Sequence, residues 1–226
     1  MQIVTEQQIA EVLNPEIAFF AVQDVFRGME SSAWNFPVVR EALQYKDALF
    51  GFKSGFDPAS GALGLKAGGY WPNNKSKGLA NHQSSIFLFD PDTGQCKAML
   101  AGNTITALRT AASSAISIDQ FACERSAVLG LIGTGHQSIF QLEAALRVRS
   151  FEEVLVWNRS ERDLTKHHQM TEAYGVRCRE MELETVVRES HVIVTIASCF
   201  EPLFPSDWVS PGTHLAAMGT DTLGKQ

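Results

Sequence analysis

The sequence predicts an α/β protein in which a Rossmann-type, doubly wound parallel sheet follows an N-terminal α+β domain. From Ser126 onward, strand-like and helix-like segments alternate, which is typical of a parallel sheet. A glycine-rich turn at residues 133–138 lies between the first of these strands and its helix, where a dinucleotide-binding loop belongs. Before it, short strand-like runs separated by turn residues fill residues 36–100, which favours a largely antiparallel sheet. We expect one domain at 1–122 and a dinucleotide-binding domain at 123–226.

Two helices are expected at the start of the chain. Thr5 and Gln8 have the spacing of a capping box. Asn14 followed by Pro15 indicates a second N-cap with proline at the first helical position. Apolar residues recur at near-helical spacing over residues 17–29, so this segment should be helical.

Strands and a third helix complete the first domain. Residues 91–94 (PDTG) predict a hairpin turn between two strand-like runs. A helical pattern rich in small residues then covers 103–121, with Asn103 or Thr104 as its cap. The expected strands lie in the runs at 36–43, 48–56, 62–71, 84–90 and 95–100.

The second domain follows a β-α-β order. Its second helix should stop at Gly175, since glycine favours a helix C-terminus. His167 and His168 are expected on an exposed face of that helix. The strands are expected at 127–132, 153–158, 176–178, 191–198 and 213–219, and the helices at 139–148, 160–175 and 183–190.

The composition is that of an ordinary globular protein, with 226 residues, 45% hydrophobic and 19% charged. The net charge of −6 argues against nucleic acid or an anionic membrane as a partner. The N-terminus lacks the basic and apolar regions of a signal peptide, and no run approaches the roughly 18 apolar residues that cross a membrane. Cys96, Cys123, Cys178 and Cys199 have neither metal-site nor disulfide spacing, so we expect reduced, mostly buried thiols in a cytoplasmic protein without a metal.

The glycine-rich turn is the strongest candidate site. Its glycines allow a tight turn and close approach of the backbone to a pyrophosphate, and the following helix N-terminus supplies N–H donors. An ordinary strand–helix turn is the alternative interpretation. The cofactor-binding candidates in this loop are Gly133, Thr134, Gly135, His136, Gln137 and Ser138.

A second set of cofactor candidates ends the next strand. NAD-binding domains usually have Asp or Glu there to bind the ribose hydroxyls, whereas this chain has Asn158, Arg159 and Ser160. An acid would repel a 2′-phosphate and arginine can pair with it, so NADP(H) is favoured and NAD(H) remains possible. A solvated surface arginine in a turn is the alternative.

Other charged residues are candidates for substrate binding and catalysis. Lys66 and Arg109 lie among small or apolar residues, and a charge in such surroundings is costly unless it is paired. Arg40 is a third cation of this kind, and surface exposure or a structural ion pair is the alternative for all three. Asp221 follows the last strand, where ligands of parallel sheets bind, although an isolated aspartate after a strand is more often a turn former or a helix cap. His82 has a pocket-lining and a structural interpretation.

These segments together resemble the ornithine cyclodeaminase/μ-crystallin family. The resemblance covers essentially the whole chain, and TALRTAA followed by GTGHQS is quite specific. The runs that carry it are LAGNTITALRTAASSAI (100–116), GLIGTGHQS (130–138), VLVWNRS (154–160) and THLAAMGTDTLGKQ (213–226).

The family match implies roles for individual residues. Lys66 and Arg109 would hold the substrate carboxylate, with Lys66 also counted as catalytic, and Arg40 matches a further carboxylate-binding arginine. Asp221 matches the catalytic acid of the cyclodeaminases. Ser138 replaces the usual alanine of the fingerprint. Family members continue beyond Gln226, so the resemblance implies a substrate-binding and dimerisation domain at 1–122 followed by a partial nucleotide domain.

The resemblance implies an NADP(H)-dependent oxidoreductase that reduces a cyclic imino acid such as Δ1-pyrroline-2-carboxylate to L-proline. One alternative is ornithine cyclodeaminase, which converts ornithine to proline and ammonia. Another is a non-catalytic, NADPH-binding protein like some μ-crystallins. A small amino or imino acid and a second copy in a homodimer are the expected partners.

Overall fold

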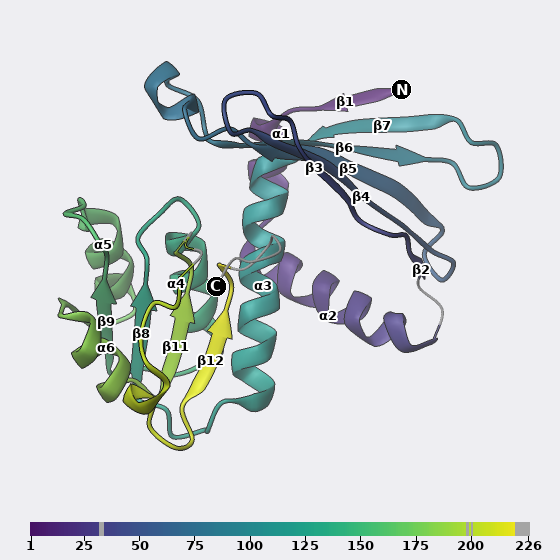
Figure 1. Cartoon of the computed structure of the whole chain (residues 1–226). Coiled ribbons are helices and arrows are strands. Elements are labelled where there is room, and N and C mark those ends of the chain that lie inside the picture. Colours follow the sequence, from purple (N-terminus) through teal and green to yellow (C-terminus); the bar gives the residue numbers. More distant parts are fainter. Residues whose placement is uncertain (32–33, 198, 200, 220–226) are drawn as a thin grey trace. The chain divides into compact units, whose positions relative to one another are not determined.

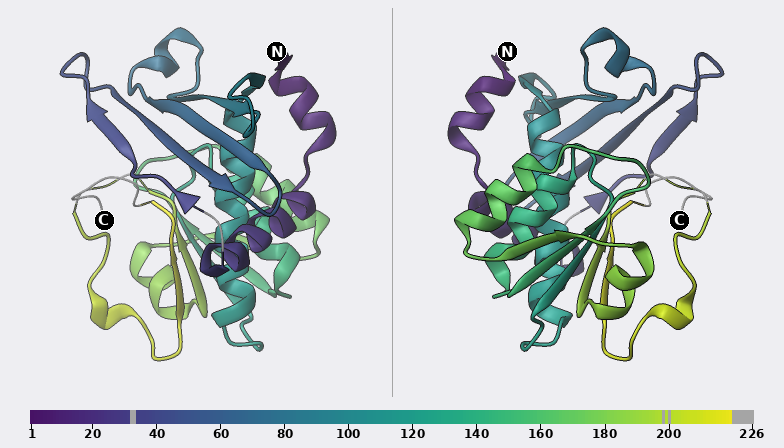
Figure 2. Two further views of the ribbon diagram at one scale, coloured as in Figure 1. Left: turned by 90° about the vertical axis from the view of Figure 1, so that its right-hand side faces the viewer. Right: turned by 90° about the vertical axis from the view of Figure 1, so that its left-hand side faces the viewer.

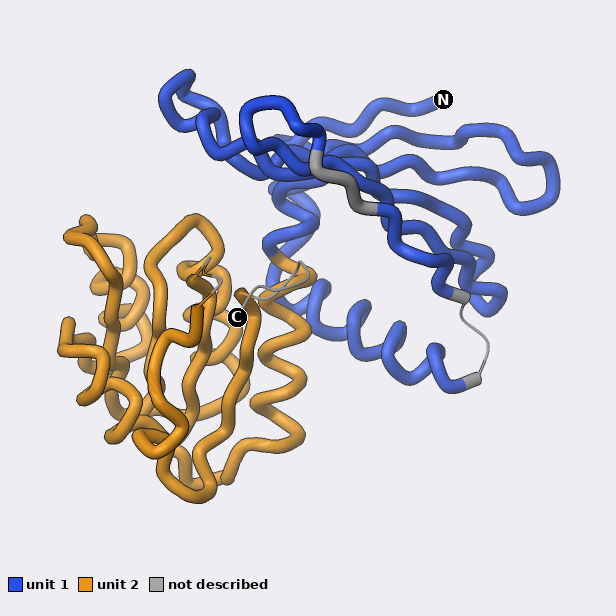
Figure 3. Tube along the Cα trace, in the orientation of Figure 1, with its two compact units in different colours: residues 1–107 blue, residues 108–226 orange. Residues whose placement is uncertain are grey.

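The computed structural model describes residues 1–31, 34–197, 199 and 201–219 (Figure 1). The chain forms two compact units, Met1–Ala107 and Leu108–Gln226 (Figure 3). Helix α3 (Asn103–Phe121) contains this division, whereas the expected domain boundary lies just after that helix.

The first unit contains a seven-stranded sheet in the order β1-β7-β6-β5-β4-β2, with β3 paired to β4. Strand β1 runs parallel to β7 and the other pairs are antiparallel. The predicted antiparallel strands are therefore confirmed, and the short strands β1 and β2 are additions to them. The strands are β1 (Gln2–Val4), β2 (Trp34–Asn35), β3 (Val39–Ala42), β4 (Leu49–Asp57), β5 (Ala62–Tyr70), β6 (His82–Phe89) and β7 (Cys96–Ala101), with a 3-10 turn η1 (Asn74–Lys77).

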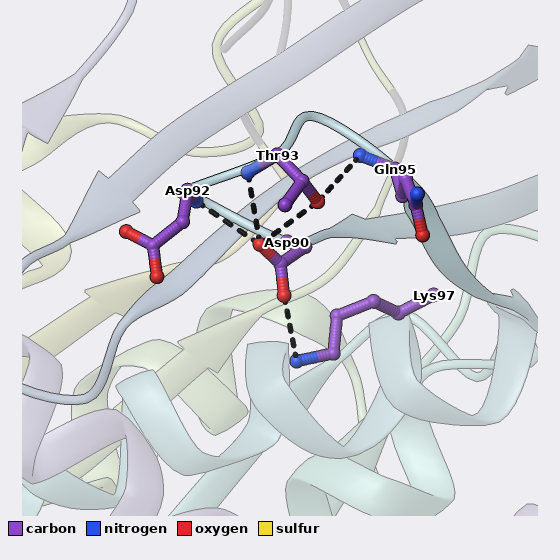
Figure 4. A network of polar contacts seen from close by, with 5 residues as sticks. All are labelled: Asp90, Asp92, Thr93, Gln95 and Lys97. Atoms are coloured by element: carbon purple, nitrogen blue, oxygen red, sulfur yellow. Dashed lines mark hydrogen bonds and ion pairs between the residues drawn. The ribbon is translucent and has the colours of Figure 1, made fainter.

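The predicted hairpin joins β6 to β7 and is organised by the residue before it (Figure 4). Oδ1 of Asp90 accepts hydrogen bonds from the backbone N–H groups of Asp92 and Thr93 and from the Thr93 hydroxyl. The Lys97 ammonium lies 3.6 Å from the other carboxylate oxygen. Gly94 completes the turn at φ +72°, a left-handed conformation that glycine adopts without strain. Local hydrogen bonds therefore fix the register of these two strands.

Helices α1 (Glu6–Val12) and α2 (Pro15–Ser31) begin as predicted. The Thr5 hydroxyl accepts from the Gln8 N–H while the Gln8 side chain accepts from the Thr5 N–H, which completes the capping box. Asn14 Oδ1 accepts from the Ile17 N–H at 2.9 Å, so asparagine caps α2. Within the chain, α2 leaves large apolar side chains exposed: Ile17 (44%), Phe20 (54%), Val25 (51%), Phe26 (47%) and Met29 (49%).

A carboxylate from α1 caps the N-terminus of α3. Glu6 accepts from the Asn103 N–H at 2.8 Å and from the Thr104 N–H at 3.0 Å. The expected cap by the side chain of Asn103 or Thr104 was wrong. Asn103 Oδ1 instead accepts from the Ser84 N–H at 3.0 Å, because Glu6 already serves the free N–H groups of the helix.

The second unit is the predicted parallel sheet, in the order β10-β9-β8-β11-β12. The chain leaves β8 to one side for β9 and β10, then returns to the other side for β11. This reversal creates the kind of crevice in which doubly wound sheets bind ligands. The elements are β8 (Val128–Ile132), α4 (Ser138–Val148), β9 (Glu153–Trp157), α5 (Thr165–Ala173), β10 (Arg177–Glu180), α6 (Leu183–Glu189), β11 (Val192–Thr195), η2 (Ser206–Trp208) and β12 (His214–Ala217).

Apolar side chains cover both faces of this sheet, with helices on either side of the strands (Figure 2). Alternate residues of each strand enter opposite clusters, because side-chain direction alternates along a strand. In β11, Val192 and Val194 join the cluster of α3 and α4, whereas Ile193 joins that of α6. All the residues of both clusters belong to the second unit. A strand buried on both faces explains why the sequence of β8 is continuously apolar.

Helix α5 differs most from expectation. It begins at Thr165 rather than near residue 160, because Asp163 accepts hydrogen bonds from the Thr165 N–H and hydroxyl and holds a turn there. His167 is buried, so its predicted exposure was wrong, whereas His168 is exposed.

No two of the four cysteines, all within the described residues, form a disulfide, and only Cys199 is buried, so the expectation of mostly buried thiols was wrong. Over the described ranges, no helix has the length and apolar character to cross a membrane. The same residues contain no group of three potential metal ligands.

The capping of α3 by Glu6 can be tested by mutation. We expect Glu6→Gln to lower the free energy of unfolding by about 1 kcal/mol at neutral pH, because the amide lacks the charge that favours a helix N-terminus. Burial raises the pKa of Glu6, but the hydrogen bonds from Asn103 and Thr104 outweigh it and the net pKa is lowered from 4.5.

The difference between wild type and Glu6→Gln should be largest above pH 4.5 and should shrink as the carboxylate is protonated at lower pH. Urea unfolding across this pH range measures it. Glu11→Gln, at an exposed position of the same helix, is the control. Equal losses in both variants would contradict the capping role.

Candidate functional site

The glycine-rich loop follows the carboxyl end of β8 and leads into α4. Gly133 has φ +105°, and a Cβ placed there would lie 2.9 Å from the Ala197 backbone nitrogen. Its N–H donates to the Trp157 carbonyl at 2.8 Å, which ties the loop to β9. Gly135 is different, because a Cβ there would meet no atom within 4 Å. Gly133 is therefore required by packing, whereas Gly135 leaves open space beside the loop backbone.

Asn158 links this loop to the segment after β9. Its Oδ1 accepts from the Thr134 N–H at 3.2 Å, and its Nδ2 donates to the Ser160 carbonyl at 2.5 Å. An aspartate could accept the first bond but could not donate the second. Asparagine thus suits this position structurally, and the adjacent Arg159 stays exposed.

Two buried oxygen atoms in the loop have no hydrogen-bond partner in the described part of the chain: Thr134 Oγ1 and Gln137 Oε1. Buried polar atoms are rarely left unpaired without a functional reason. The Thr134 hydroxyl can donate to an anion, so together with the open space at Gly135 and the N-terminus of α4 it fits a ligand such as a dinucleotide pyrophosphate. Gln137 Oε1 can only accept a hydrogen bond and does not contribute to this fit.

A cavity of about 450 Å³ lies beside the segment that follows Arg159. It is lined by Glu161, Arg162, Asp163 and Glu180, so three carboxylates face one guanidinium. Arg159 favours a 2′-phosphate on the cofactor, whereas these carboxylates oppose one. Charges of both signs therefore lie in this segment, next to the exposed Arg159.

The proposed substrate residues occupy different elements. Lys66, half-buried in β5, donates from Nζ to the Thr106 hydroxyl at 3.3 Å. Arg109 is exposed three residues after Thr106 in the same helix, α3, and residues at this spacing share a helix face. Arg40 lies in β3 opposite Gly51, and its side chain is outside the described structure.

The remaining candidates are less informative about chemistry. Asp221 lies outside the described residues. His136 is exposed, with its ring centroid 5.5 Å from that of Phe140. His82 is half-buried at the start of β6.

One residue of this region was missed from the sequence. His167 in α5 is only 5% exposed, and its Nε2 lies 2.8 Å from the Ser138 hydroxyl of the loop. Leu164, His167 and Thr171 are all buried. Their helical spacing in the sequence indicates a buried helix face if histidine is counted among the core residues.

The chain is similar to known proteins in both sequence and structure. Residues 8–226 match the model of the ornithine cyclodeaminase/mu-crystallin family. The chain is 51% identical to the iminosuccinate reductase of Paracoccus denitrificans, over 100% of this chain and 71% of that protein. The crystal structure of that reductase in complex with NAD+ superposes with a TM-score of 0.91 and covers 100% of this chain and 70% of the other.

Two further solved structures are similar over nearly the whole chain. Δ1-pyrroline-2-carboxylate reductase of Thermococcus litoralis, in complex with NADH and L-proline, is 25% identical with a TM-score of 0.90 and covers 95% of this chain and 68% of that one. An archaeal alanine dehydrogenase dimer with bound NAD is 30% identical with a TM-score of 0.93, over 100% of this chain and 69% of the other. These similarities confirm the predicted fold class.

The two loop glycines provide a paired test. Gly133→Ala should lower the free energy of unfolding by about 1–3 kcal/mol, because its Cβ would meet the Ala197 backbone in a strained conformation. Gly135→Ala should keep its stability within about 0.5 kcal/mol. It should nevertheless weaken NADH binding at least about tenfold, since a methyl group would fill the approach to the backbone.

Urea unfolding and titration of NADH fluorescence measure the two effects separately, and each variant is the control for the other. Gly135→Ala binding NADH as tightly as wild type would contradict the assignment of this loop to the cofactor.

Proposed function

The chain belongs to the ornithine cyclodeaminase/mu-crystallin family, and from this we propose that it is an NAD(P)H-dependent reductase of small 2-imino acids. The 51% identity with an iminosuccinate reductase along the whole chain is the observation that carries the proposal. When bound, the reduced nicotinamide supplies a hydride to the imine carbon, and a proton completes the amine at nitrogen. The fit of the 133–138 loop to a pyrophosphate supports the cofactor.

We propose iminosuccinate, an open-chain dicarboxylate that is reduced to aspartate, as the first substrate to test. Lys66 and Arg109 would bind a carboxylate, and Arg40 adds a third cation. Three cations suit a substrate with two carboxylates better than a substrate with one. Fixing the carboxylates would hold the imine carbon in position for reduction, and positioning of this kind lowers the barrier by several kcal/mol.

Δ1-Pyrroline-2-carboxylate is the second candidate. It is favoured by the similarity to the Thermococcus structure, which holds L-proline. Its product would be proline. In either reaction Asp221 is our proposed proton donor to the imine nitrogen.

A homodimer is proposed as the assembled form. The exposed apolar residues of α2 would cost less free energy when covered by a second copy. The alanine dehydrogenase relative is described as a dimer.

Substrate choice is tested by following the loss of nicotinamide absorbance. We expect turnover with oxaloacetate plus ammonium, which form iminosuccinate in solution, and less with Δ1-pyrroline-2-carboxylate. This chain and a fusion to the C-terminal remainder of the Paracoccus reductase should both be assayed. Arg109→Ala should lower kcat/KM by roughly 10²-fold or more, because carboxylate positioning is lost.

Arg147→Ala, an exposed helical arginine paired with Glu143, should leave kcat/KM unchanged and is the matched control. Ammonia release from ornithine without added cofactor would move the assignment to cyclodeaminase. Tight NADPH binding without turnover of any of these substrates would support a binding protein instead.

Cofactor preference is tested at Arg159. Arg159→Ala should weaken NADPH binding by about 1 kcal/mol and leave NADH binding unchanged, since only NADPH carries the 2′-phosphate. Arg125→Ala, at another exposed arginine, controls for net charge. Equal effects on the two cofactors would show that Arg159 does not contact the 2′-phosphate.

A further inference from the structure

A buried serine–histidine pair lies beneath the glycine-rich loop. Ser138, the first residue of α4, is fully buried, and its hydroxyl donates to the Gly135 carbonyl at 2.7 Å. The same hydroxyl oxygen lies 2.8 Å from Nε2 of His167. One loop residue and one residue from each of two helices, α4 and α5, therefore form a series of hydrogen bonds that ends on the loop backbone.

The hydrogen bonds determine which ring nitrogen carries the proton. A serine hydroxyl has one hydrogen, and here it is donated to the Gly135 carbonyl. His167 Nε2 must then be the donor to Ser138. His167 Nδ1 is left as an unprotonated, buried acceptor, which has no hydrogen-bond partner among the described residues. The reverse arrangement would bury an unpaired N–H group, which is rarer in folded proteins.

The surroundings keep this ring neutral. Burial lowers the pKa of His167 most, and the neighbouring His168 lowers it further, while Asp163 opposes both. A neutral ring fits the single donor that the Ser138 contact requires.

This series of hydrogen bonds acts on the peptide group that joins Gly135 to His136. The Gly135 carbonyl accepts both the N–H of Ser138, at 3.0 Å, and its hydroxyl. In a trans peptide the C=O and N–H groups point in opposite directions. Holding the carbonyl against Ser138 therefore turns the His136 N–H away from the start of α4. Glycine has no side chain to restrict its own backbone, so the loop needs this external restraint.

We propose that His167 is a positioning residue for the cofactor: through Ser138 it holds the Gly135–His136 peptide so that its N–H faces the pyrophosphate. This inference rests on the proposed dinucleotide function of the loop. His167 touches no cofactor atom in this scheme. Its effect should therefore be seen in cofactor affinity and not in the reduction of the imine.

Two variants remove different members of this series of hydrogen bonds. Ser138→Ala removes the hydroxyl, and His167→Leu removes the ring donor. Each should raise the Kd for NADH, and the KM for NADH, by about tenfold, while kcat at saturating NADH stays unchanged. His167→Gln keeps a side-chain N–H donor and cannot titrate, so it should restore affinity close to that of wild type.

A second serine–histidine pair provides the matched control. Ser117 Oγ lies 3.1 Å from Nε2 of His214, which begins β12, at the opposite end of the parallel strands from the loop. Ser117→Ala and His214→Gln should leave the Kd for NADH unchanged, even where they lower the melting temperature. Recording unfolding for every variant separates affinity from stability.

The outcomes separate this inference from the proposed function. A wild-type chain that binds neither NADH nor NADPH overturns both. Normal NADH affinity in folded Ser138→Ala and His167→Leu overturns the inference alone, and so does a folded His167→Gln that binds as poorly as His167→Leu. Nitrogen-15 NMR of the His167 ring tests the hydrogen bonds directly, and its signals are identified by their absence in His167→Gln. A tautomer with hydrogen on Nδ1 would also overturn the inference.

Discussion

The second unit depends on how closely the backbone segments approach one another at the carboxyl ends of its parallel strands. Gly133 and Gly219 both pack against Ala197, and a Cβ at Gly219 would overlap the Ala197 carbonyl oxygen. Because side chains are excluded there, backbone groups rather than packed side chains lie at the carboxyl ends of β8, β11 and β12. Backbone N–H groups and the start of α4 are thereby left to interact with a ligand. The position of the glycine-rich loop at the switch point between β8 and β11 follows from this packing.

Neutral groups, rather than charges, hold the glycine-rich loop in place. Asn158 accepts from one end of the loop and donates to the segment after β9, and Ser138 holds the Gly135 carbonyl near the other end. A carboxylate in either role would repel a bound pyrophosphate, and a buried cation would need its own counter-charge. Uncharged hydrogen bonds fix the loop without competing with the ligand, so the ligand's charge can be met by N–H groups that the fold has already oriented.

Much of the fold was predictable because the signals are local. The capping box at Thr5, the proline start of α2 and the hairpin at 91–94 all depend on residues within four positions of one another. The order of strands and helices in the second unit followed from periodicity. The errors arose where distant residues compete for the same groups. Glu6 took the role expected of Asn103 from 97 residues away, and no local pattern indicates a partner so remote.

The same distinction separates the parts of the candidate site. Glycine spacing identified the loop, because tight turns require that residue type, but the burial of His167 depends on α5 packing beneath α4. The proposed substrate groups illustrate the difference further. Lys66 can be recognised as a cation in an apolar strand, yet only the structure shows that it donates to Thr106, one helical turn before Arg109. A threonine hydroxyl is a weak partner for an ammonium group compared with a carboxylate. A substrate carboxylate near the Lys66 ammonium would form the stronger, charge-assisted kind of hydrogen bond, which supports the proposal of an anionic substrate.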